Sequence, residues 1–286
     1  MITVTHDFFD IATIADSGQC FRCNAIAENR YRLIAQNKVL CIEKIDANLY
    51  RFDCSIADFD NIWKPYFDFD TDYGRFCSRV AAKDAFLQRA ALYGVGMRIL
   101  RQDAFEMLIT FIISQRKNIP AIKKCVETLC SRFGAQIGSE SDVCFAFPSA
   151  QALAAQSLES LRACALGYRA AYVKAAATMV ATGALDLEKI SKYNDASLYD
   201  ALLSVPGVGA KVANCVMLFG FYRIASFPQD VWINRMIDIE YGGNFPLARY
   251  RDYAGVMQQY IFYYARSDAY AQSKKAAAMD CDCATE

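Results

Sequence analysis

Lys211 and Cys215 are two side chains whose types and spacing can serve a chemical reaction. They lie four residues apart in the segment 202–221, LLSVPGVGAKVANCVMLFGF, so a helix there places both on one face. An amine attacks carbon only in its neutral form, which burial and the positive end of a helix both favour. Asp230, in the later segment FPQDVW, can stabilise positive charge that develops beside the amine. Lys211 and Asp230 are therefore the candidate catalytic residues of these two segments.

The turn before Lys211 predicts a site for an anion. It separates two apolar helices, which start near Asp195 and at Ala210. We expect Gly207 and Gly209 to take unusual backbone dihedrals and to leave their N–H groups uncovered. Because the second helix begins there, these groups and the positive end of its dipole favour a bound backbone phosphate. The alternative is an ordinary turn with a solvated lysine and a helix-capping aspartate, but the ordered set favours the functional interpretation.

Composition predicts an intracellular globular protein without a membrane span. The chain has 286 residues, of which 55% are hydrophobic and 22% are charged, enough for two compact subdomains. No apolar run reaches the roughly 20 residues that a membrane span needs. The N-terminus lacks a basic region, and the 12 cysteines are scattered, so we expect reduced thiols and no secretion. The expected location is cytoplasmic (the bacterial nucleoid) or nuclear.

Charge is distributed unevenly, although the net charge is zero. Residues 43–72 contain eight acidic and three basic side chains, whereas residues 73–132 contain eleven basic and four acidic ones. Such asymmetry fits a protein that meets phosphate with one face, and it equally fits a solvated charged surface.

The elements that must position these residues divide into a small sheet and a larger helical part. Segments 31–35 and 39–43 alternate apolar with polar residues and predict antiparallel strands within 1–55, whereas the pattern from about Asp58 onward is helical. We predict a mainly α fold with a small N-terminal antiparallel β domain (α+β). The expected units are 1–72, a helical domain 73–270 with its hairpin at about 198–221, and a tail 271–286. Expected helix ends are Asp103, Pro120, Gly134, Ser149, Ser157, Gly167 and Gly183, with a last helix over 247–267.

The hairpin followed by Phe227-Pro-Gln-Asp230 resembles the helix-hairpin-helix DNA glycosylase superfamily. Further segments, which cover about residues 10–265, resemble its 8-oxoguanine DNA glycosylase/AP lyase branch, the type best known from eukaryotes. They are SGQCFR at 17–22, GVGMRILRQD at 94–103, LGYRA at 166–170, and Tyr253-Ala-Gly with Gln258 and Phe262. This resemblance implies a helix-hairpin-helix glycosylase fold. It also implies a partner, double-stranded DNA that contains a damaged base.

The resemblance implies a role for each matched residue in the pocket. Such enzymes extrude the damaged nucleotide from the duplex. Phe262 would stack on one face of the purine and Cys215 would lie against the other, while Gln258 would bind its Watson–Crick edge. The carbonyl of Gly18 would accept a hydrogen bond from the N7–H that distinguishes 8-oxoguanine from guanine. Lys211 would attack C1′ to form a Schiff base, and β-elimination would cleave the strand.

The residues expected to contact the strand opposite the lesion depart from the family pattern. Tyr168 and Arg169 resemble the residues that fill the gap and contact the unpaired cytosine. The Asn-Asn-Asn of the family is replaced by the run from Gln115 to Asn118, in which Arg116 and Asn118 are expected to contact DNA. Ala121 replaces an arginine, and Trp232, also expected at the DNA, replaces a histidine. The preference for the base opposite the lesion is therefore left open.

Two other functions remain open from the sequence. The chain can be a glycosylase of the same fold for an alkylated or deaminated base, or a binder of DNA structure without catalysis. His6 is the only histidine, and Cys20-x-x-Cys23 has no second pair at metal-binding spacing, so we predict no metal site and no required cofactor. The resemblance permits a monovalent ion at hairpin carbonyls. We expect a monomer.

Overall fold

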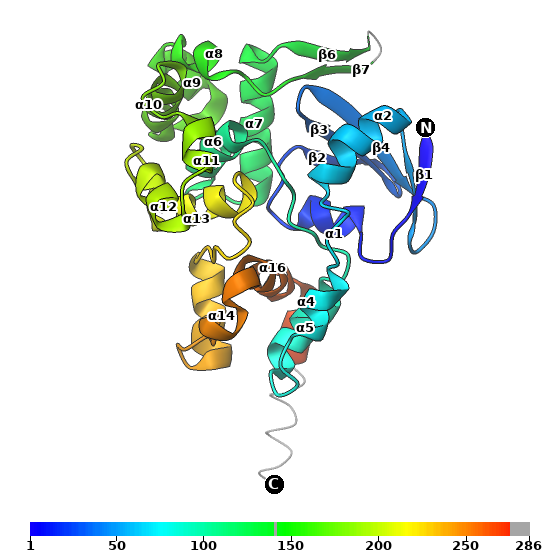
Figure 1. Ribbon diagram of the computed structural model, residues 1–286. Coiled ribbons are helices and arrows are strands. Elements are labelled where there is room, and N and C mark those ends of the chain that lie inside the picture. Colours follow the sequence, from blue (N-terminus) through cyan, green and yellow to red (C-terminus); the bar gives the residue numbers. More distant parts are fainter. Residues whose placement is uncertain (140–141, 275–286) are drawn as a thin grey trace.

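The computed structural model describes residues 1–139 and 142–274 and has a small sheet beside a larger helical body (Figure 1). The sheet has five antiparallel strands in the order β1-β5-β4-β3-β2. The strands are β1 (Ile2–Thr5), β2 (Cys23–Ala27), β3 (Arg30–Ala35), β4 (Lys38–Lys44) and β5 (Leu49–Phe52). The predicted strands are confirmed as β3 and β4. Gln36 and Asn37 join them with positive φ at both residues, as a two-residue hairpin turn requires.

One face of the sheet is buried under apolar side chains from the segments beside it. Leu40 and Ile42 alternate with less buried neighbours along β4 and point into this core. The covering elements are α1 (Ile11–Asp16), a π-helical turn (Phe59–Trp63) and α3 (Lys64–Tyr66), and the short helix α2 (Ile56–Asp58) leads into the π-helical turn. Leu100, from the segment that leads into the helical body, also belongs to this core. The two bodies are thus joined by apolar packing as well as by the chain.

The helical body is built around the long helices α6, α7, α10, α13 and α16. Helix α16 packs between α5 and α14 in the lower part of Figure 1, while the two hairpin helices, α12 and α13, lie on the left. The bounds are α4 (Gly74–Ser78), α5 (Ala85–Tyr93), α6 (Ala104–Ser114), α7 (Ile119–Phe133), α8 (Ala150–Ala154), α9 (Leu158–Leu161), α10 (Arg169–Ala181), α11 (Leu187–Ser191), α12 (Asp195–Leu203), α13 (Ala210–Phe219), α14 (Val231–Tyr241), α15 (Leu247–Tyr250) and α16 (Ala254–Ala265).

The capping residues lie where the sequence predicts them. Asp103, Ser149 and Ser157 each accept a hydrogen bond from the backbone N–H three residues later and so begin α6, α8 and α9. Pro120 stands in the first turn of α7, and Gly134 ends that helix. Gly167 and Gly183, both with positive φ, follow the expected helix ends.

Two expectations about the helical part are wrong. The chain after α7 forms a β-hairpin of β6 (Gln136–Ser139) and β7 (Asp142–Phe145), which an ion pair from Arg32 to Asp142 ties to the sheet. The last long helix is broken, because a 3-10 turn at Arg251–Tyr253 separates α15 from α16. At this break the N–H of Gly255 donates to the carbonyl of Ile224, in a loop that packs against it.

The C-terminal segment lies partly outside the described residues. Of the tail expected at 271–286, residues 271–274 are helical, and Lys274 forms an ion pair with Glu240. Residues 275–286 are outside the described part of the chain. Among the helices that the structure describes, none is long and apolar enough to cross a bilayer.

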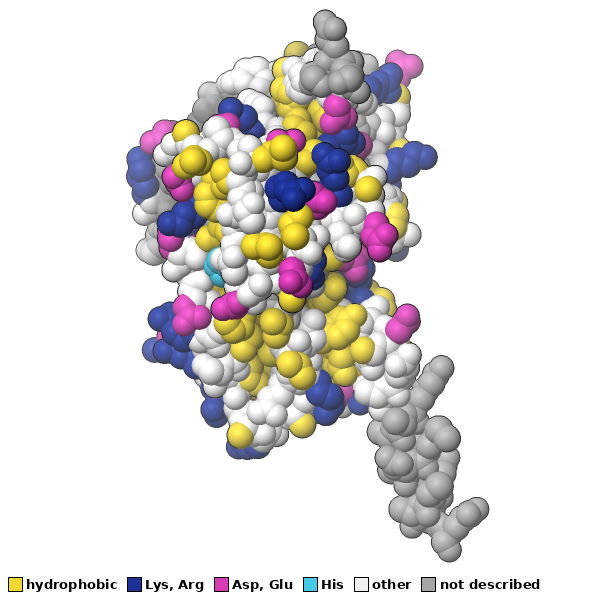
Figure 2. Space-filling view, turned by 90° about the vertical axis from the view of Figure 1, so that its right-hand side faces the viewer, with side chains coloured by type: hydrophobic (Ala, Val, Ile, Leu, Met, Phe, Trp, Pro, Cys, Tyr) yellow, Lys and Arg dark blue, Asp and Glu magenta, His cyan; other side chains and the backbone are white. Residues whose placement is uncertain are grey.

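The side of the molecule that carries α5 has mixed surface chemistry. Figure 2 shows basic and acidic side chains interspersed on this side, with apolar side chains gathered on its lower half. Leu92, Tyr93 and Val95, at the end of α5 and in the turn after it, are exposed apolar residues. The hairpin helices lie on the opposite side of Figure 1. The predicted phosphate site is therefore remote from this apolar surface.

A buried carboxylate joins the sheet domain to the loop after α13. Asp68 lies in the sheet domain with positive φ, and its Oδ1 accepts from Arg101 Nε at 3.1 Å and Nη2 at 2.8 Å. Tyr222, at the start of the loop that leads to Asp230, donates its hydroxyl to the other oxygen of Asp68. Arg101 also lies 3.7 Å from the centre of the Tyr222 ring. This cluster fixes the start of the loop that delivers Asp230.

The substitution Asp68→Asn tests this cluster, because it keeps the size and the tolerance of positive φ but removes the charge. We expect the free energy of unfolding to fall by about 1.5–3 kcal/mol in urea titrations, the range for hydrogen bonds to a charged group. Asp70→Asn is the matched control, since Asp70 is 78% exposed in its ion pair with Lys64. The control should change stability by less than about 0.5 kcal/mol. Equal effects of the two substitutions would show that the cluster is unimportant.

Candidate active site

The hairpin leaves the start of α13 open. Gly207 has φ of +82°, and a Cβ there would lie 2.3 Å from Cγ of Tyr172, so this position requires glycine. Gly209 has ordinary extended dihedrals, so the predicted unusual conformation is confirmed only at Gly207. Nothing lies within 4 Å of a Cβ built on Gly209, and α13 begins there without a side-chain cap. Uncapped N–H groups in open space are the features that an anion site needs.

Helix α13 carries two of the three residues predicted for the chemistry, Lys211 and Cys215. Lys211 is half-buried in the first turn of α13, with Nζ 5.2 Å from the centre of the Phe111 ring. Cys215 is buried one turn later. Its pKa is raised by burial, lowered by the adjacent Lys211 ammonium, and raised by the carboxylate of Asp230. Both charges therefore act on the Cys215 thiol.

Asp230 has a structural role as well. Its Oδ1 accepts a hydrogen bond of 2.8 Å from the N–H of Ile233 and so caps α14. This cap uses one of the two carboxylate oxygens and fixes the orientation of the side chain. The capping interpretation and the catalytic interpretation are thus compatible, because an anchored carboxylate is a preorganised charge.

A second group of predicted residues meets where the sheet domain touches α16. A Cβ on Gly18, which has φ of +77°, would lie 3.1 Å from Cε1 of Phe262 and 3.0 Å from Cδ1 of Ile119. Gln258, one turn before Phe262, is 4% exposed, and its Oε1 accepts from Nε2 of Gln259 at 3.0 Å. The structure therefore confirms that Gly18 and Phe262 are neighbours, with Gln258 on the same helix.

Sequence reasoning missed two residues that contact this group. The guanidinium of Arg266 lies 5.0 Å from the centre of the Phe262 ring, a stacking contact that the i, i+4 spacing could have suggested. Ile119 closes the space beside Gly18, and only the three-dimensional arrangement shows this.

Buried hydrogen bonds hold the loop that carries Gly18. The side chain of Gln19 donates to Ser17 Oγ at 3.1 Å and to the carbonyl of Arg98 at 2.9 Å. Its Oε1 accepts from the N–H of Leu100, and Gln102 donates to its backbone carbonyl, both at 2.9 Å. The motifs SGQCFR and RILRQD are therefore linked to each other by Gln19 and Gln102.

Helix α7 holds the same loop from the other side. Lys123 Nζ contacts the carbonyls of Ala15 and Cys23 and Oδ1 of Asn24, at 3.3, 2.9 and 3.1 Å. One turn later, Glu127 forms an ion pair with the buried side chain of Arg22 at 3.2 Å. Some basic residues of the stretch 73–132, such as Lys123, thus form hydrogen bonds within the protein. The excess of positive charge in that stretch is therefore not wholly available at the surface.

The residues predicted for the opposite strand fall into two kinds. Tyr168 is 53% exposed, and Arg116 and Trp232 are also exposed, as DNA contacts should be. Asn118 instead caps α7, accepting from the N–H of Ala121 at 2.9 Å. Arg169 is only 7% exposed and donates its Nε to the carbonyl of Gln115 at 2.8 Å. Its guanidinium is thus used inside the protein, and its contact with the opposite base stays a prediction.

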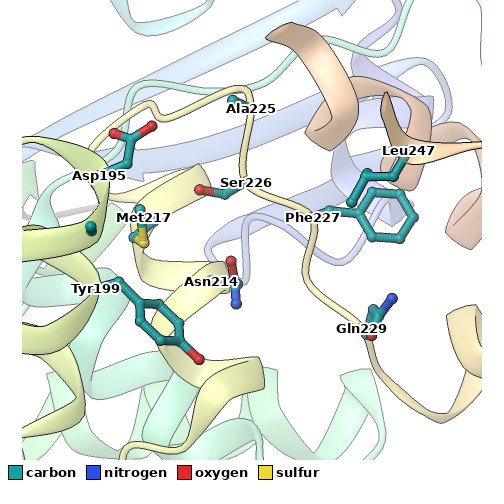
Figure 3. A pocket seen from close by; sticks show the side chains of 10 residues that line it. Asp195, Tyr199, Asn214, Met217, Ala225, Ser226, Phe227, Gln229 and Leu247 are labelled. Carbon is teal, nitrogen blue, oxygen red and sulfur yellow. The ribbon is translucent and has the colours of Figure 1, made fainter. Parts of the chain in front are cut away.

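An open cleft of about 500 Å³ lies beside the hairpin (Figure 3). Tyr199 and Asn214 reach it from the hairpin helices, and Phe227 and Gln229 reach it from the loop across. Neither Lys211 nor the pocket residues near Gly18 line this cleft. It is therefore separate from the candidate chemistry. Among the described residues, no group of three or more His, Cys, Asp or Glu side chains is arranged to hold a metal ion.

Two family models match this chain. Residues 1–108 match the family model described as the 8-oxoguanine DNA glycosylase N-terminal domain. Residues 109–244 match that of the HhH-GPD superfamily of base excision DNA repair proteins. The chain belongs to the 8-oxoguanine DNA glycosylase family. The mainly helical fold with a small N-terminal antiparallel sheet is the fold of this family, as the sequence predicts.

Solved structures of the 8-oxoguanine DNA glycosylase family superpose along nearly the whole chain. A protein named MBOgg1, solved with a low-affinity DNA ligand, is 35% identical with a TM-score of 0.87, covering 92% of this chain and 94% of its own. The 8-oxoguanine glycosylase/lyase of Clostridium acetobutylicum, bound to DNA with cytosine opposite 8-oxoguanine, is 31% identical. Its TM-score is 0.86, and the match covers 93% of this chain and 98% of the other.

Curated relatives of the 8-oxoguanine DNA glycosylase family match over a shorter stretch. The N-glycosylase/DNA lyase of Saccharomyces cerevisiae is 33% identical over 207 residues, which are 67% of this chain and 50% of that protein. The chain spans between 44% and 64% of the length of the curated relatives that it matches.

Gly18→Ala should block the pocket, and Gly183→Ala is its control. Both glycines have φ of +77°, but a Cβ meets Phe262 and Ile119 at Gly18 and nothing within 4 Å at Gly183. Each variant carries a similar backbone cost of about 1–2 kcal/mol, visible as lower stability in urea. Only Gly18→Ala should also lose more than about 10-fold in release of the purine that the sequence predicts for this pocket, because a small displacement at a reacting group has a large effect on rate. Equal activity of both variants would place the purine elsewhere.

Glu106, near Arg22, should make stability depend on pH. Burial raises the pKa of its carboxyl to about 7, while Arg22 opposes this and Asp103 and Glu127 reinforce it. Because the folded protein binds this proton more tightly than the unfolded chain, the contribution is present at pH 4 and is lost as pH rises through 7. Glu106→Gln should therefore gain about 1–3 kcal/mol over the wild type between pH 5 and pH 8. A stability difference that is constant with pH would contradict this.

Proposed function

We propose that this protein is a bifunctional DNA glycosylase/AP lyase that excises 8-oxoguanine from duplex DNA. The observation that carries the proposal is the position of Lys211. It stands in the first turn of a helix whose start is open to a phosphate, one turn before buried Cys215, a thiol on which the anchored carboxylate of Asp230 also acts. The N-glycosylase/DNA lyase names of the relatives support this proposal.

Recognition of the lesion is assigned to the meeting point of the sheet domain and α16. A purine that leaves the duplex stacks on Phe262, with Cys215 on its other face, and Gln258 binds its Watson–Crick edge. The carbonyl of Gly18 accepts from N7–H of 8-oxoguanine, whereas the lone pair on N7 of guanine would face that oxygen and be repelled. The buried bonds of Gln19 keep the carbonyl in place.

The proposed reaction begins at the amine of Lys211. Its lone pair forms a bond to C1′, and the N9–C1′ bond breaks with the electron pair going to the base, which takes up a proton. Ring opening gives a Schiff base, loss of a proton from C2′ expels the 3′ phosphate, and water then releases the lysine. Asp230 stabilises the positive charge that the sugar carries in the transition state.

The open start of α13 holds a phosphate of the damaged strand, and Tyr168, Arg116 and Trp232 meet the DNA around the gap. We propose that the protein acts as a monomer on chromosomal DNA, in the nucleoid or the nucleus, without a metal or cofactor. With Ala121 in place of an arginine and the Arg169 guanidinium held inside the protein, we expect weaker discrimination for cytosine opposite the lesion.

Borohydride trapping tests the proposal. Duplexes that contain 8-oxoguanine opposite each of the four bases are incubated with protein and borohydride, beside a hypoxanthine duplex. We expect a covalent adduct on the 8-oxoguanine duplexes and its loss in Lys211→Gln. Lys189→Gln, a substitution of an exposed lysine on helix α11, is the control and should trap like the wild type. No adduct despite normal binding to the duplexes would refute the proposal, and an adduct only on hypoxanthine would indicate a glycosylase for deaminated bases.

A further inference from the structure

Gln115 connects three segments that are far apart in the sequence. It follows α6, and its Nε2 donates to the carbonyl of Gly207 in the hairpin at 3.0 Å and to that of Ile112 at 3.2 Å. Its own backbone carbonyl accepts from the guanidinium of Arg169, at the start of α10. One residue thus joins the hairpin, the segment 115–118 and the first turn of α10.

Additional contacts join the segment 115–118 to the first turn of α10. Lys117 Nζ donates to the carbonyl of Ala165 at 3.1 Å, in the turn before α10. Arg169 also donates to the carbonyl of Leu166 at 3.3 Å and lies 4.4 Å from the centre of the Tyr168 ring. Tyr168 in turn packs edge-on against Tyr172, the residue that leaves no room for a side chain at Gly207.

The residues beside these anchors are the ones exposed to a duplex. Arg116, next to Gln115, is exposed and has φ of +54°, so its side chain departs from a strained and therefore defined position. Tyr168, next to Arg169, is exposed as well. Gln115 donates to the carbonyl of Gly207 in the hairpin, two residues before the open helix start at Gly209. The phosphate site and the two exposed side chains are therefore rigidly related through Gln115.

We propose that Gln115 is a positioning residue that couples the phosphate grip of the hairpin to insertion of Arg116 and Tyr168 into the duplex. This inference rests on the proposed function and extends it to the step before chemistry. When the hairpin holds the backbone, the Gln115 bridge fixes where Arg116 and Tyr168 enter the space that the extruded base leaves. Without the bridge, DNA still binds but the base is extruded less often.

The amide of Gln115 suits this role because both of its contacts are carbonyl oxygens. Gln115→Glu has the same shape but presents a carboxylate to the carbonyls of Gly207 and Ile112, which repel it. Gln115→Met has a similar length and offers no donor. Gln151→Glu is the matched control, because Gln151 is an exposed residue of α8.

The test compares four measurements on each variant. Binding to an undamaged duplex measures the phosphate grip, and fluorescence of 2-aminopurine placed beside 8-oxoguanine measures extrusion. Single-turnover base release is then compared with strand cleavage of a duplex that already contains an abasic site, where no base has to leave the stack. For Gln115→Glu we expect base release to fall about 10–100-fold with reduced fluorescence, since misplacement by about 1 Å has an effect of this size. Binding to undamaged DNA and abasic cleavage should change less than about 3-fold, which corresponds to about 0.65 kcal/mol.

Several outcomes would overturn the inference. An equal fall in base release and abasic cleavage would mean that Gln115 supports the catalytic site in general. Unchanged base release in Gln115→Glu would mean that the bridge is not used, while the proposed function would stand. If Gln115→Glu does not fold, Gln115→Met decides the question by the same comparison. A wild-type protein that releases no 8-oxoguanine would refute the proposed function itself.

Discussion

The buried guanidinium of Arg98 is the interaction on which the recognition pocket depends. A charge inside a protein is tolerated only when it is well paired, and Arg98 donates to the carbonyls of Phe8, Phe67 and Thr71 at 2.7–2.8 Å. It also lies 4.2 Å from the centre of a tyrosine ring. Burial lowers its pKa, although nearby acidic groups oppose this. Its own carbonyl accepts from Gln19, so the loop with Gly18 is fixed relative to both bodies.

Other buried polar side chains also link the sheet domain to the helical part of the protein. Arg22 and Lys123 tie the Gly18 loop to α7, and Asp68 ties the sheet domain to the loop before Asp230. Hydrogen bonds suit this purpose because they are directional, whereas apolar contacts permit small sliding. The candidate site draws residues from positions as far apart as Gly18 and Phe262, so it needs fixed geometry more than additional stability.

Several residues serve the fold and the proposed chemistry at once. Asp230 caps α14 while its charge acts at Cys215, and Gly207 is required by Tyr172 while its carbonyl receives Gln115. Such double use explains why structural and functional interpretations of one motif are hard to separate from sequence. A cap that orients a carboxylate also prepares it for catalysis, because the side chain does not have to reorganise during the reaction.

The sequence by itself determined the local structure and the pocket candidates. Strands β3 and β4, the caps at Asp103 and Ser149, and the hairpin before Lys211 follow from patterns that neighbouring residues satisfy among themselves. The tertiary structure alone decided the β6–β7 hairpin, the break before α16, and the use of Arg169 inside the protein. The break before α16 and the use of Arg169 depend on which distant carbonyl comes opposite, and the charge of Arg32 ties the β6–β7 hairpin to the sheet. No local pattern encodes these contacts. Long-range hydrogen bonding therefore set what sequence spacing could not.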